Sequence, residues 1–510
     1  MENYLVFLRS IVELLITPRF LLLMAIFVVI GILLGALPGI SVNMSLILAL
    51  PLTYGMDTRT AMVVLLACYN GAQTGGLISA IMLNIPGTSS AMTTTFDGHP
   101  MALKGEGGRA LGVGILTSVV GGTISFLLLI FLAPVIAKFA INFGPWEYFA
   151  IGIFSLTMIT AVVGDDMAKG FLAALIGMAL AMTGTDPVTN VIRFNFGNHA
   201  LDGGVTTTAL MSGFFAIPEL LKLVMKDKDE TLEVLKAKKF KGYGISFKEY
   251  LSQWKNILRS AFLGAYTGVL PGIGSSAASV LSYSIGKKRN KDGHLWGTGC
   301  VSGIIASETA NNACIGGALI PMLALGVPGS TSAGILMSSL NLHGITTGPL
   351  VFQKEVNLVY MMFAVCFVAN FLVLILERLM LNGFIKVLTL PRRIIMVEVM
   401  AMCFIGAYSS RSNPTDLIIF VVGGFLGYFL QKAGVKRAPI VLGYILCDIV
   451  EKNFRRGMSM TQMNMTPMFT SPIAMAFLLV AAFVMVRTVI QNIKAKKTKK
   501  AGEEEPETNI

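Results

Sequence analysis

Residues 307–332 place polar groups inside a strongly apolar stretch, and these groups are the first that could do chemistry. They comprise a carboxylate, two amides, and three hydroxyls that follow a helix-breaking pair: Glu308, Asn311, Asn312, Pro328-Gly329, Ser330, Thr331 and Ser332. Irregular polar backbone at membrane depth is tolerated only where it lines a cavity or is buried in protein. The stretch therefore predicts a broken membrane helix, and the alternative is an ordinary span followed by a loop.

The composition indicates that this chain is a membrane protein. Hydrophobic residues make up 54% of the sequence and charged residues 13%, and the mean hydropathy is +0.72. These values lie far outside those of soluble domains. The net charge of +12 does not indicate a nucleic-acid partner, because the cations gather in residues 226–256, in 287–291 and near the C-terminus. Loop cations of this kind set membrane topology.

A second copy of the broken stretch lies in the first half of the chain. Leu83-Asn-Ile-Pro-Gly-Thr-Ser-Ser-Ala91 matches Leu325-Gly-Val-Pro-Gly-Ser-Thr-Ser-Ala333, and Leu37-Pro-Gly-Ile40 matches Leu270-Pro-Gly-Ile273. Self-similarity over such a distance is the signature of an internal repeat. We predict a first membrane repeat at 1–225, a hydrophilic linker at 226–256, a second repeat at 257–456, a final transmembrane helix at 457–490 and a charged tail at 491–510.

Charge placement predicts that the two repeats are inverted. If the linker and the tail are cytoplasmic, the loop at Gly55–Arg59 with one cation and the matching 287–291 loop with four fall on opposite sides. Arg455-Arg456 is an exception to this topology. The fold class expected is an all-α polytopic membrane protein with two inverted-topology repeats, broken helices or re-entrant hairpins, and about 12–14 membrane segments.

A helix broken by Pro-Gly leaves free N–H groups at one half-helix and free carbonyls at the other, which attract anions and small cations. We assign substrate binding to one set of residues: Asn70, Gly87, Thr88, Ser89, Ser90, Gly329, Ser330, Thr331 and Ser332. We assign ion coupling, with Na⁺ or H⁺ as the ion, to another: Gly39, Ser41, Gly272, Ser275, Glu308, Asn311 and Asn312. Helix capping is the alternative role for each single hydroxyl.

Glu308 has no acidic counterpart in the first repeat, because aligning the Pro-Gly pairs places Leu66 opposite it. An ionised carboxylate there needs a bound cation or donors such as Asn311 and Asn312, since burial otherwise favours the neutral acid. The alternative is a glutamate at the end of a span that faces water.

The motifs resemble those of a known family, the large membrane subunit of tripartite tricarboxylate transporters. The similarity runs from about Leu33 to Pro439 and rests on six segments: Gly35-Ala-Leu-Pro-Gly-Ile40, Asn84-Ile-Pro-Gly-Thr88, Asp97-Gly-His-Pro-Met-Ala102, Gly264–Ile273, Glu308-Thr-Ala-Asn-Asn-Ala313 and Pro328-Gly-Ser330. The resemblance implies a multi-pass permease of the bacterial inner membrane. It also implies that the permease works with a small membrane subunit and a periplasmic solute-binding protein, and imports carboxylates with an ion gradient.

Other functions have weaker support in the sequence. An enzyme would need a catalytic constellation, and the apolar spans show none, so we expect no enzymatic activity and no cofactor other than the coupling ion. A stand-alone carboxylate symporter and a channel are the alternatives. Broken helices in two inverted halves favour alternating access over an open pore.

Overall fold

The computed structural model describes residues 2–162, 167–186, 188–225, 243–290, 292–388, 392–409 and 411–503, and these are almost entirely helical. The helices before residue 226 are α1 (Glu2–Ile16), α2 (Pro18–Ala36), α3 (Val42–Ala49), α4 (Thr58–Leu83), α5 (Thr94–Met101), α6 (Gly107–Ala140), α7 (Pro145–Val162), α8 (Met167–Ala181) and α9 (Thr207–Val224). A two-stranded antiparallel ladder, β1 (Gly184–Thr185) and β2 (Ile192–Arg193), lies between α8 and α9.

The helices after residue 242 are α10 (Phe247–Ser252), α11 (Trp254–Val269), α12 (Gly274–Arg289), α13 (Val301–Leu325), α14 (Thr331–Leu342), α15 (Val351–Lys354), α16 (Val356–Val387), α17 (Arg392–Ser409), α18 (Pro414–Lys432), α19 (Arg437–Met460), α20 (Thr466–Thr470) and α21 (Pro472–Glu503). The chain forms two compact units. Unit 1 comprises 1–141 and 206–428, and unit 2 comprises 142–205 and 429–510. Each unit therefore draws on both halves of the sequence.

Six helical segments among the described residues are long and apolar enough to cross a membrane: Pro18–Ala36, Thr58–Leu83, Thr94–Ala140, Val356–Val387, Pro414–Lys432 and Pro472–Asn492. Three apolar helices are shorter, at Val42–Thr53, Met167–Ala181 and Met396–Ser409. The predicted all-α polytopic membrane fold is confirmed. The Thr58–Leu83 span is buried throughout, because neighbouring helices of unit 1 surround it.

Both predicted breaks near the start of each sequence half are present. α2 ends before Leu37-Pro-Gly, where Gly39 has a φ of +98°, and the chain re-enters a helix at α3. α11 ends at the matching place, where Gly272 has a φ of +83°, and α12 follows. These left-handed conformations suit glycine, which has no Cβ to clash with the backbone. Each apolar run is thus a pair of helices.

The second landmark is also built alike in the two halves. α4 ends at Asn84 and α13 ends at Gly326, and both residues adopt the left-handed conformation, with φ of 56° and 74°. The Pro-Gly turns follow directly. The short 3-10 helix η2 (Ser89–Met92) begins after the first turn, and α14 begins after the second.

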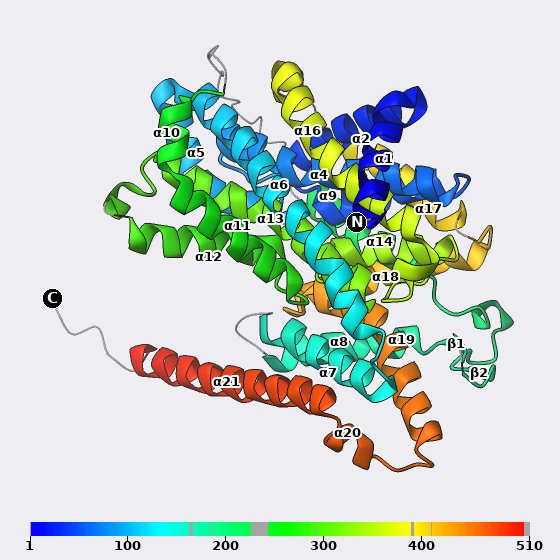
Figure 1. Ribbon diagram of the computed structural model, residues 1–510. Helices are drawn as coiled ribbons and strands as arrows, with labels where there is room; N and C mark the ends of the chain where they lie inside the picture. The colour runs from blue at the N-terminus through cyan, green and yellow to red at the C-terminus, as the bar shows by residue number, and fades with distance from the viewer. Residues whose placement is uncertain are drawn as a thin grey trace. The chain divides into compact units, whose positions relative to one another are not determined.

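Small residues allow α2 to pack closely on α4, and α11 on α13. A Cβ at Gly35 would collide with the backbone carbonyl of Ala72, and a Cβ at Gly268 would collide with that of Cys314. Backbones approach this closely in membrane proteins where glycines line the helix interface. In Figure 1, α11 and α13 in green lie beside α6, in agreement with the contacts of α6 with both helices.

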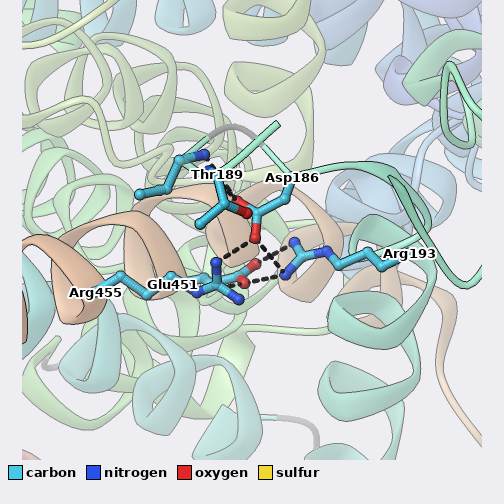
Figure 2. A network of polar contacts seen from close by, with 6 residues as sticks. Asp186, Thr189, Arg193, Glu451 and Arg455 are labelled. Carbon is cyan, nitrogen blue, oxygen red and sulfur yellow. Dashed lines mark hydrogen bonds and ion pairs between the residues drawn. The ribbon is translucent and has the colours of Figure 1, made fainter. Parts of the chain in front are cut away.

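Unit 2 contains a network of charged side chains between the β1–β2 connection and α19 (Figure 2). Arg193 and Arg455 both pair with the buried Asp186 and with Glu451. The second Arg193–Glu451 contact, Nη2 to Oε2, is 2.7 Å. Arg455, an exception to the predicted topology, therefore forms ion pairs with residues of unit 2.

Two expected segments are only partly described. Residues 226–242 of the predicted linker lie outside the described residues, and the remainder forms α10 and the start of α11. The predicted tail begins at 491, but α21 continues without a break to Glu503, and the last seven residues lie outside the described part of the chain. Sequence analysis also missed α1, α5 and α14.

Candidate functional site

Glu308, the eighth residue of α13, is fully buried, so it does not face water. Its Oε2 atom accepts hydrogen bonds from Ser118 Oγ of α6 at 3.1 Å and from Asn311 Nδ2 at 3.1 Å. Asn312 Nδ2 lies 3.5 Å from the same oxygen, and Thr94 of α5 donates its hydroxyl to Oε1. Neutral donors from three helices therefore satisfy this carboxylate, as a buried charge requires.

The two predicted amides beside Glu308 also join α13 to α4. Gln73 Nε2 donates to Asn311 Oδ1 at 2.5 Å, and Thr74 Oγ1 donates to Asn312 Oδ1 at 3.0 Å. Because Asn311 and Asn312 give their N–H groups to Glu308 and receive donors on their oxygens, their orientation is fixed on both sides. We call Glu308, Asn311, Asn312, Gln73, Thr74, Thr94 and Ser118 the carboxylate hub.

Asn70 is the counterpart of Asn312 in the repeat alignment, and both make the same helix bond. Asn70 Nδ2 donates to Leu66 O at 2.8 Å, and Asn312 Nδ2 donates to Glu308 O at 3.2 Å. The two differ at Oδ1. Oδ1 of Asn312 accepts from the Thr74 hydroxyl. The residue of the second half that matches Thr74 is Gly316, which has no hydroxyl, and the buried Oδ1 of Asn70 has no partner among the described residues. An open acceptor of this kind can receive a ligand donor or water.

The first Pro-Gly turn contacts α12, which belongs to the other half of the sequence. Ser276 Oγ on α12 donates to Ser89 Oγ at 2.8 Å. Thr88 Oγ1 and Ser90 Oγ lie 3.1 Å apart, and Gln73 Nε2 lies 3.5 Å from Ser90 Oγ. The first turn is thus linked to the carboxylate hub through Gln73, and Ser89 is its exposed member.

The second Pro-Gly turn contacts α3 in the same way. Ser332 Oγ donates to Asn43 Oδ1 at 2.6 Å. Ser330 caps α14, because its Oγ accepts from Ala333 N at 3.2 Å. The Tyr69 hydroxyl of α4 is within hydrogen-bonding reach of Ser330 and Ser332. Thr331 starts α14 and is buried.

Some N–H groups that a broken helix should free are already taken. Gly87 N donates to Gly76 O at 3.3 Å, and Gly329 N donates to Ala318 O at 3.4 Å. These peptide groups hold each turn against its own preceding helix. An anion would therefore be bound chiefly through the hydroxyls, which can donate as well as accept.

The predicted ion-coupling residues fall into two places. Glu308, Asn311 and Asn312 form the hub, whereas Gly39, Ser41, Gly272 and Ser275 lie at the breaks before α3 and α12. Ser41 caps α3 through Met44 N at 3.2 Å, and Gly272 N donates to Gly329 O at 3.2 Å. No hydrogen bond among the described residues joins these four to Glu308.

Asp97, in one of the motifs quoted above, was assigned no role from the sequence, and it connects the two halves of the chain. It is fully buried on α5, and its Oδ1 accepts from the backbone N–H groups of Gly297, Gly299 and Cys300 at 2.8, 3.0 and 2.7 Å. Its Oδ2 accepts from Tyr283 at 2.8 Å. The first half thereby caps the start of α13 in the second half.

Several residues of the site were missed by sequence analysis: Asn43, Tyr69, Gln73, Thr74, Thr94, Asp97, Ser118 and Ser276. Gln73 and Asn70 lie in the amide-rich part of an apolar run, and the criterion that selected Asn311 would also have selected Gln73. The single hydroxyls carry no such signal, because serine and threonine are common inside membrane helices.

Membrane-length helices around a buried polar hub, with broken helices in two similar halves, define a polytopic membrane protein with the architecture of a transporter. The model of the tripartite tricarboxylate transporter TctA family matches residues 21–442, and the chain belongs to this family. It is thus a component of a tripartite tricarboxylate transporter, a system with other subunits. The family expected from the motifs is confirmed.

Two relatives come from Agrobacterium vitis. An uncharacterized 52.8 kDa protein in the TAR-I ttuC' 3' region is 32% identical over 478 residues, which cover 94% of this chain and 95% of that protein. An uncharacterized protein in the TAR-II ttuC' 3' region is 33% identical over 234 residues, which cover 46% of this chain and 97% of that protein. No solved structure matches the chain.

Proposed function

We propose that this chain is the permease subunit that moves carboxylates, such as tricarboxylates or dicarboxylates, into the cell across the bacterial inner membrane. Transport is coupled to Na⁺ or H⁺ and depends on a periplasmic solute-binding protein and a small membrane subunit. Its two membrane repeats run in opposite directions, with the hydrophilic linker on the cytoplasmic side.

The observation that carries this proposal is the reciprocal placement of the two Pro-Gly turns. The turn of the first half contacts α12 of the second half, and the turn of the second half contacts α3 of the first. Two similar halves that each hold the other's broken helix suit a carrier whose site opens alternately to the two sides. A fixed pore needs no such exchange.

The hydroxyl-rich turns are the proposed binding place for the carboxylate substrate, together with the open acceptor of Asn70. Ser89 and Ser330 are the more accessible members of their turns. No hydrogen bond or ion pair among the described residues joins a Lys or Arg to Ser89 or Ser330, so a co-bound cation would supply positive potential for the anion. The carboxylate hub is the proposed place for that cation.

The test is reconstitution of the purified chain with its small membrane subunit in proteoliposomes. Labelled carboxylate uptake is measured with and without the solute-binding protein, under a Na⁺ gradient and under a pH gradient. We expect uptake only with the binding protein and one of the gradients, and counterflow of labelled for unlabelled substrate. Strong uptake by the chain alone would favour a stand-alone symporter, and flux without counterflow would favour a channel.

A further inference from the structure

Glu377 on α16 is a second carboxylate inside a membrane-length helix, and it belongs neither to the carboxylate hub nor to the Pro-Gly turns. Its side chain is fully buried. Neither Oε1 nor Oε2 has a hydrogen-bond partner among the described residues. This contrasts with Glu308, which receives donors from three helices. A buried ionised carboxylate without donors is strongly destabilising, so this one needs a ligand of its own.

Glu377 lies on a helix that packs against α6, which also contributes Ser118 to the hub. Asn370, two helical turns earlier on the same face of α16, donates its amide to Val119 O of α6 at 2.9 Å. Ser118, the residue before Val119, donates to Glu308. Glu308 and Glu377 are close enough to interact electrostatically. Glu308 and Glu377 therefore lie on two different helices, α13 and α16, that both pack against α6.

No hydrogen bond or ion pair among the described residues joins a Lys or Arg to Glu308 or Glu377. The charged residues of the helices packed against α16 lie at the surface, alone or in exposed pairs: Arg9 and Glu13 of α1, Arg19 of α2, Arg59 of α4, Arg109 and Lys138 of α6, and Lys354 of α15. Arg59 pairs with Glu13, and Arg109 pairs with Glu106 and Glu249. Of the described charged groups, Glu308 is the one that interacts electrostatically with Glu377.

Glu377 accepts no hydrogen bond from any described residue, so nothing in the described chain stabilises a negative charge on it. A Na⁺ ion bound to Glu377 would need several further oxygen ligands. A proton needs only one carboxylate oxygen. Two nearby carboxylates also disfavour simultaneous ionisation, which makes binding of one proton by the pair favourable.

We propose that Glu377 is a proton-binding site of the transport cycle, which carries its proton in the conformation seen here and releases it in another. The step is a simple dissociation, in which the carboxyl O–H bond breaks and the proton passes to water. The Tyr243 hydroxyl donates to Leu374 O at 3.3 Å, one turn before Glu377, so the half-buried segment before α10 lies beside this part of α16. Release toward the linker side is the shortest route that these contacts suggest.

This inference rests on the proposed function as an ion-coupled carrier, and it assigns the coupling ion as a proton. The test compares counterflow with net pH-driven uptake in proteoliposomes for wild type, Glu377→Gln and Glu377→Asp. A neutral amide mimics the permanently protonated acid, so Glu377→Gln should keep exchange of bound substrates and lose net uptake with its accompanying proton movement. Glu377→Asp should keep both, because it still titrates.

The outcomes separate the two claims. A wild-type protein that shows neither counterflow nor uptake contradicts the proposed function itself. An active wild type together with a Glu377→Gln variant that still moves protons with substrate overturns the assignment of Glu377 and leaves the carrier function standing.

A spectroscopic readout does not depend on transport. Infrared difference spectra between wild type and Glu377→Gln should show the carbonyl band of a protonated carboxyl group in the wild type only. Glu355→Gln, at the start of the same helix, is the matched control and should retain the band. Identical spectra for wild type and Glu377→Gln would overturn the proposal.

Stability provides the remaining check. Because Glu377 has no donors to lose, Glu377→Leu should fold and stay as stable as wild type, in the way that unpaired buried charges can be replaced by apolar groups. If Glu377→Gln and Glu377→Leu both unfold, the carboxylate has a structural partner and the proposal fails.

Discussion

Ser332 Oγ donates a 2.6 Å hydrogen bond to Asn43 Oδ1, and this contact has a near-equivalent elsewhere in the chain. Aligning the Leu-Pro-Gly-Ile segments places Ser276 opposite Asn43, and Ser276 bonds Ser89, one residue from the counterpart of Ser332. Each half of the chain therefore contributes its turn to the other half's broken helix. A pair of separate domains would keep such contacts within each domain.

Labelling of introduced cysteines should show that the matching loops lie on opposite sides of the membrane. In a Cys300→Ala background, Gly55→Cys should react with an impermeant thiol reagent from the periplasm and Lys288→Cys from the cytoplasm. Gly55 is exposed with free space around it, and Lys288 is exposed. The other native cysteines are buried. Reaction of both from one side would rule out inversion.

Adding one methyl group at Gly35 or Gly268 should destabilise unit 1. A Cβ at either position meets backbone carbonyl atoms of the neighbouring helix, which cannot move aside as a side chain can. We expect a loss of about 1–3 kcal/mol in the free energy of unfolding for Gly35→Ala or Gly268→Ala. Thermal unfolding in detergent measures it. Gly55→Ala, in open space, is the control and should leave the midpoint unchanged.

Glu308→Gln should remove charge without breaking the hub. The amide oxygen can take the place of Oε2 and accept from Ser118 and the two asparagines, while the amide nitrogen faces Thr94, whose hydroxyl can accept. The variant should be as stable as wild type, with weaker dependence of uptake on ion concentration. Glu308→Leu should instead lose stability by a few kcal/mol, because buried donors are left unpaired.

If the ion dependence of Glu308→Gln equals that of wild type, the carboxylate is a structural hub only. The coupling ion would then have to bind elsewhere, at Glu377 or at the breaks near Ser41 and Ser275.

The stabilising effect of Asp186 should depend on pH. Backbone N–H donation from Val188 at 2.8 Å, followed by Thr189 and Arg455, lowers the pKa of Asp186 to about 2. Because the pKa is lower in the folded state, the ionised carboxylate contributes its full stabilisation above the unfolded-state pKa near 4. This stabilisation is lost as the pH falls through the folded-state pKa of about 2. Asp186→Asn should therefore melt earlier than wild type at pH 7, and the difference should shrink as the pH is lowered from 4 toward 2. A constant difference would contradict this cause.

Much of the architecture could be predicted because its signals are local. Apolar runs mark the spans, and Pro-Gly pairs mark the breaks. The apolar runs at 110–136, 168–184, 357–385 and 415–432 predict spans, and α6, α8, α16 and α18 lie close to these four ranges. α14 was missed because its twelve residues are too few for a span and follow a turn-forming stretch. α5 was missed because it is polar and contains Pro100.

The site was only partly predictable, since its partners are far apart in sequence. Glu308 and Asn311 stood out as polar groups in an apolar run, but their bonds to Ser118 and Gln73 depend on which helices cross. Glu377 satisfies the same criterion as Glu308 and could have been found from the sequence. Its lack of donors becomes visible only in the folded chain.

The most direct test of the account is the substrate concentration at half-maximal counterflow in Ser89→Ala and Ser330→Ala. Each loses one neutral hydrogen bond to the carboxylate, about 1 kcal/mol, which raises that concentration roughly fivefold. Ser330→Ala also removes the cap of α14. Ser246→Ala, which removes the cap of α10, and Ser338→Ala, which removes a hydroxyl inside α14, are the controls. We predict weaker substrate affinity in the two turn variants, with unchanged ion dependence and unaltered controls. Wild-type affinity in both turn variants would contradict the claim that the paired turns hold the substrate.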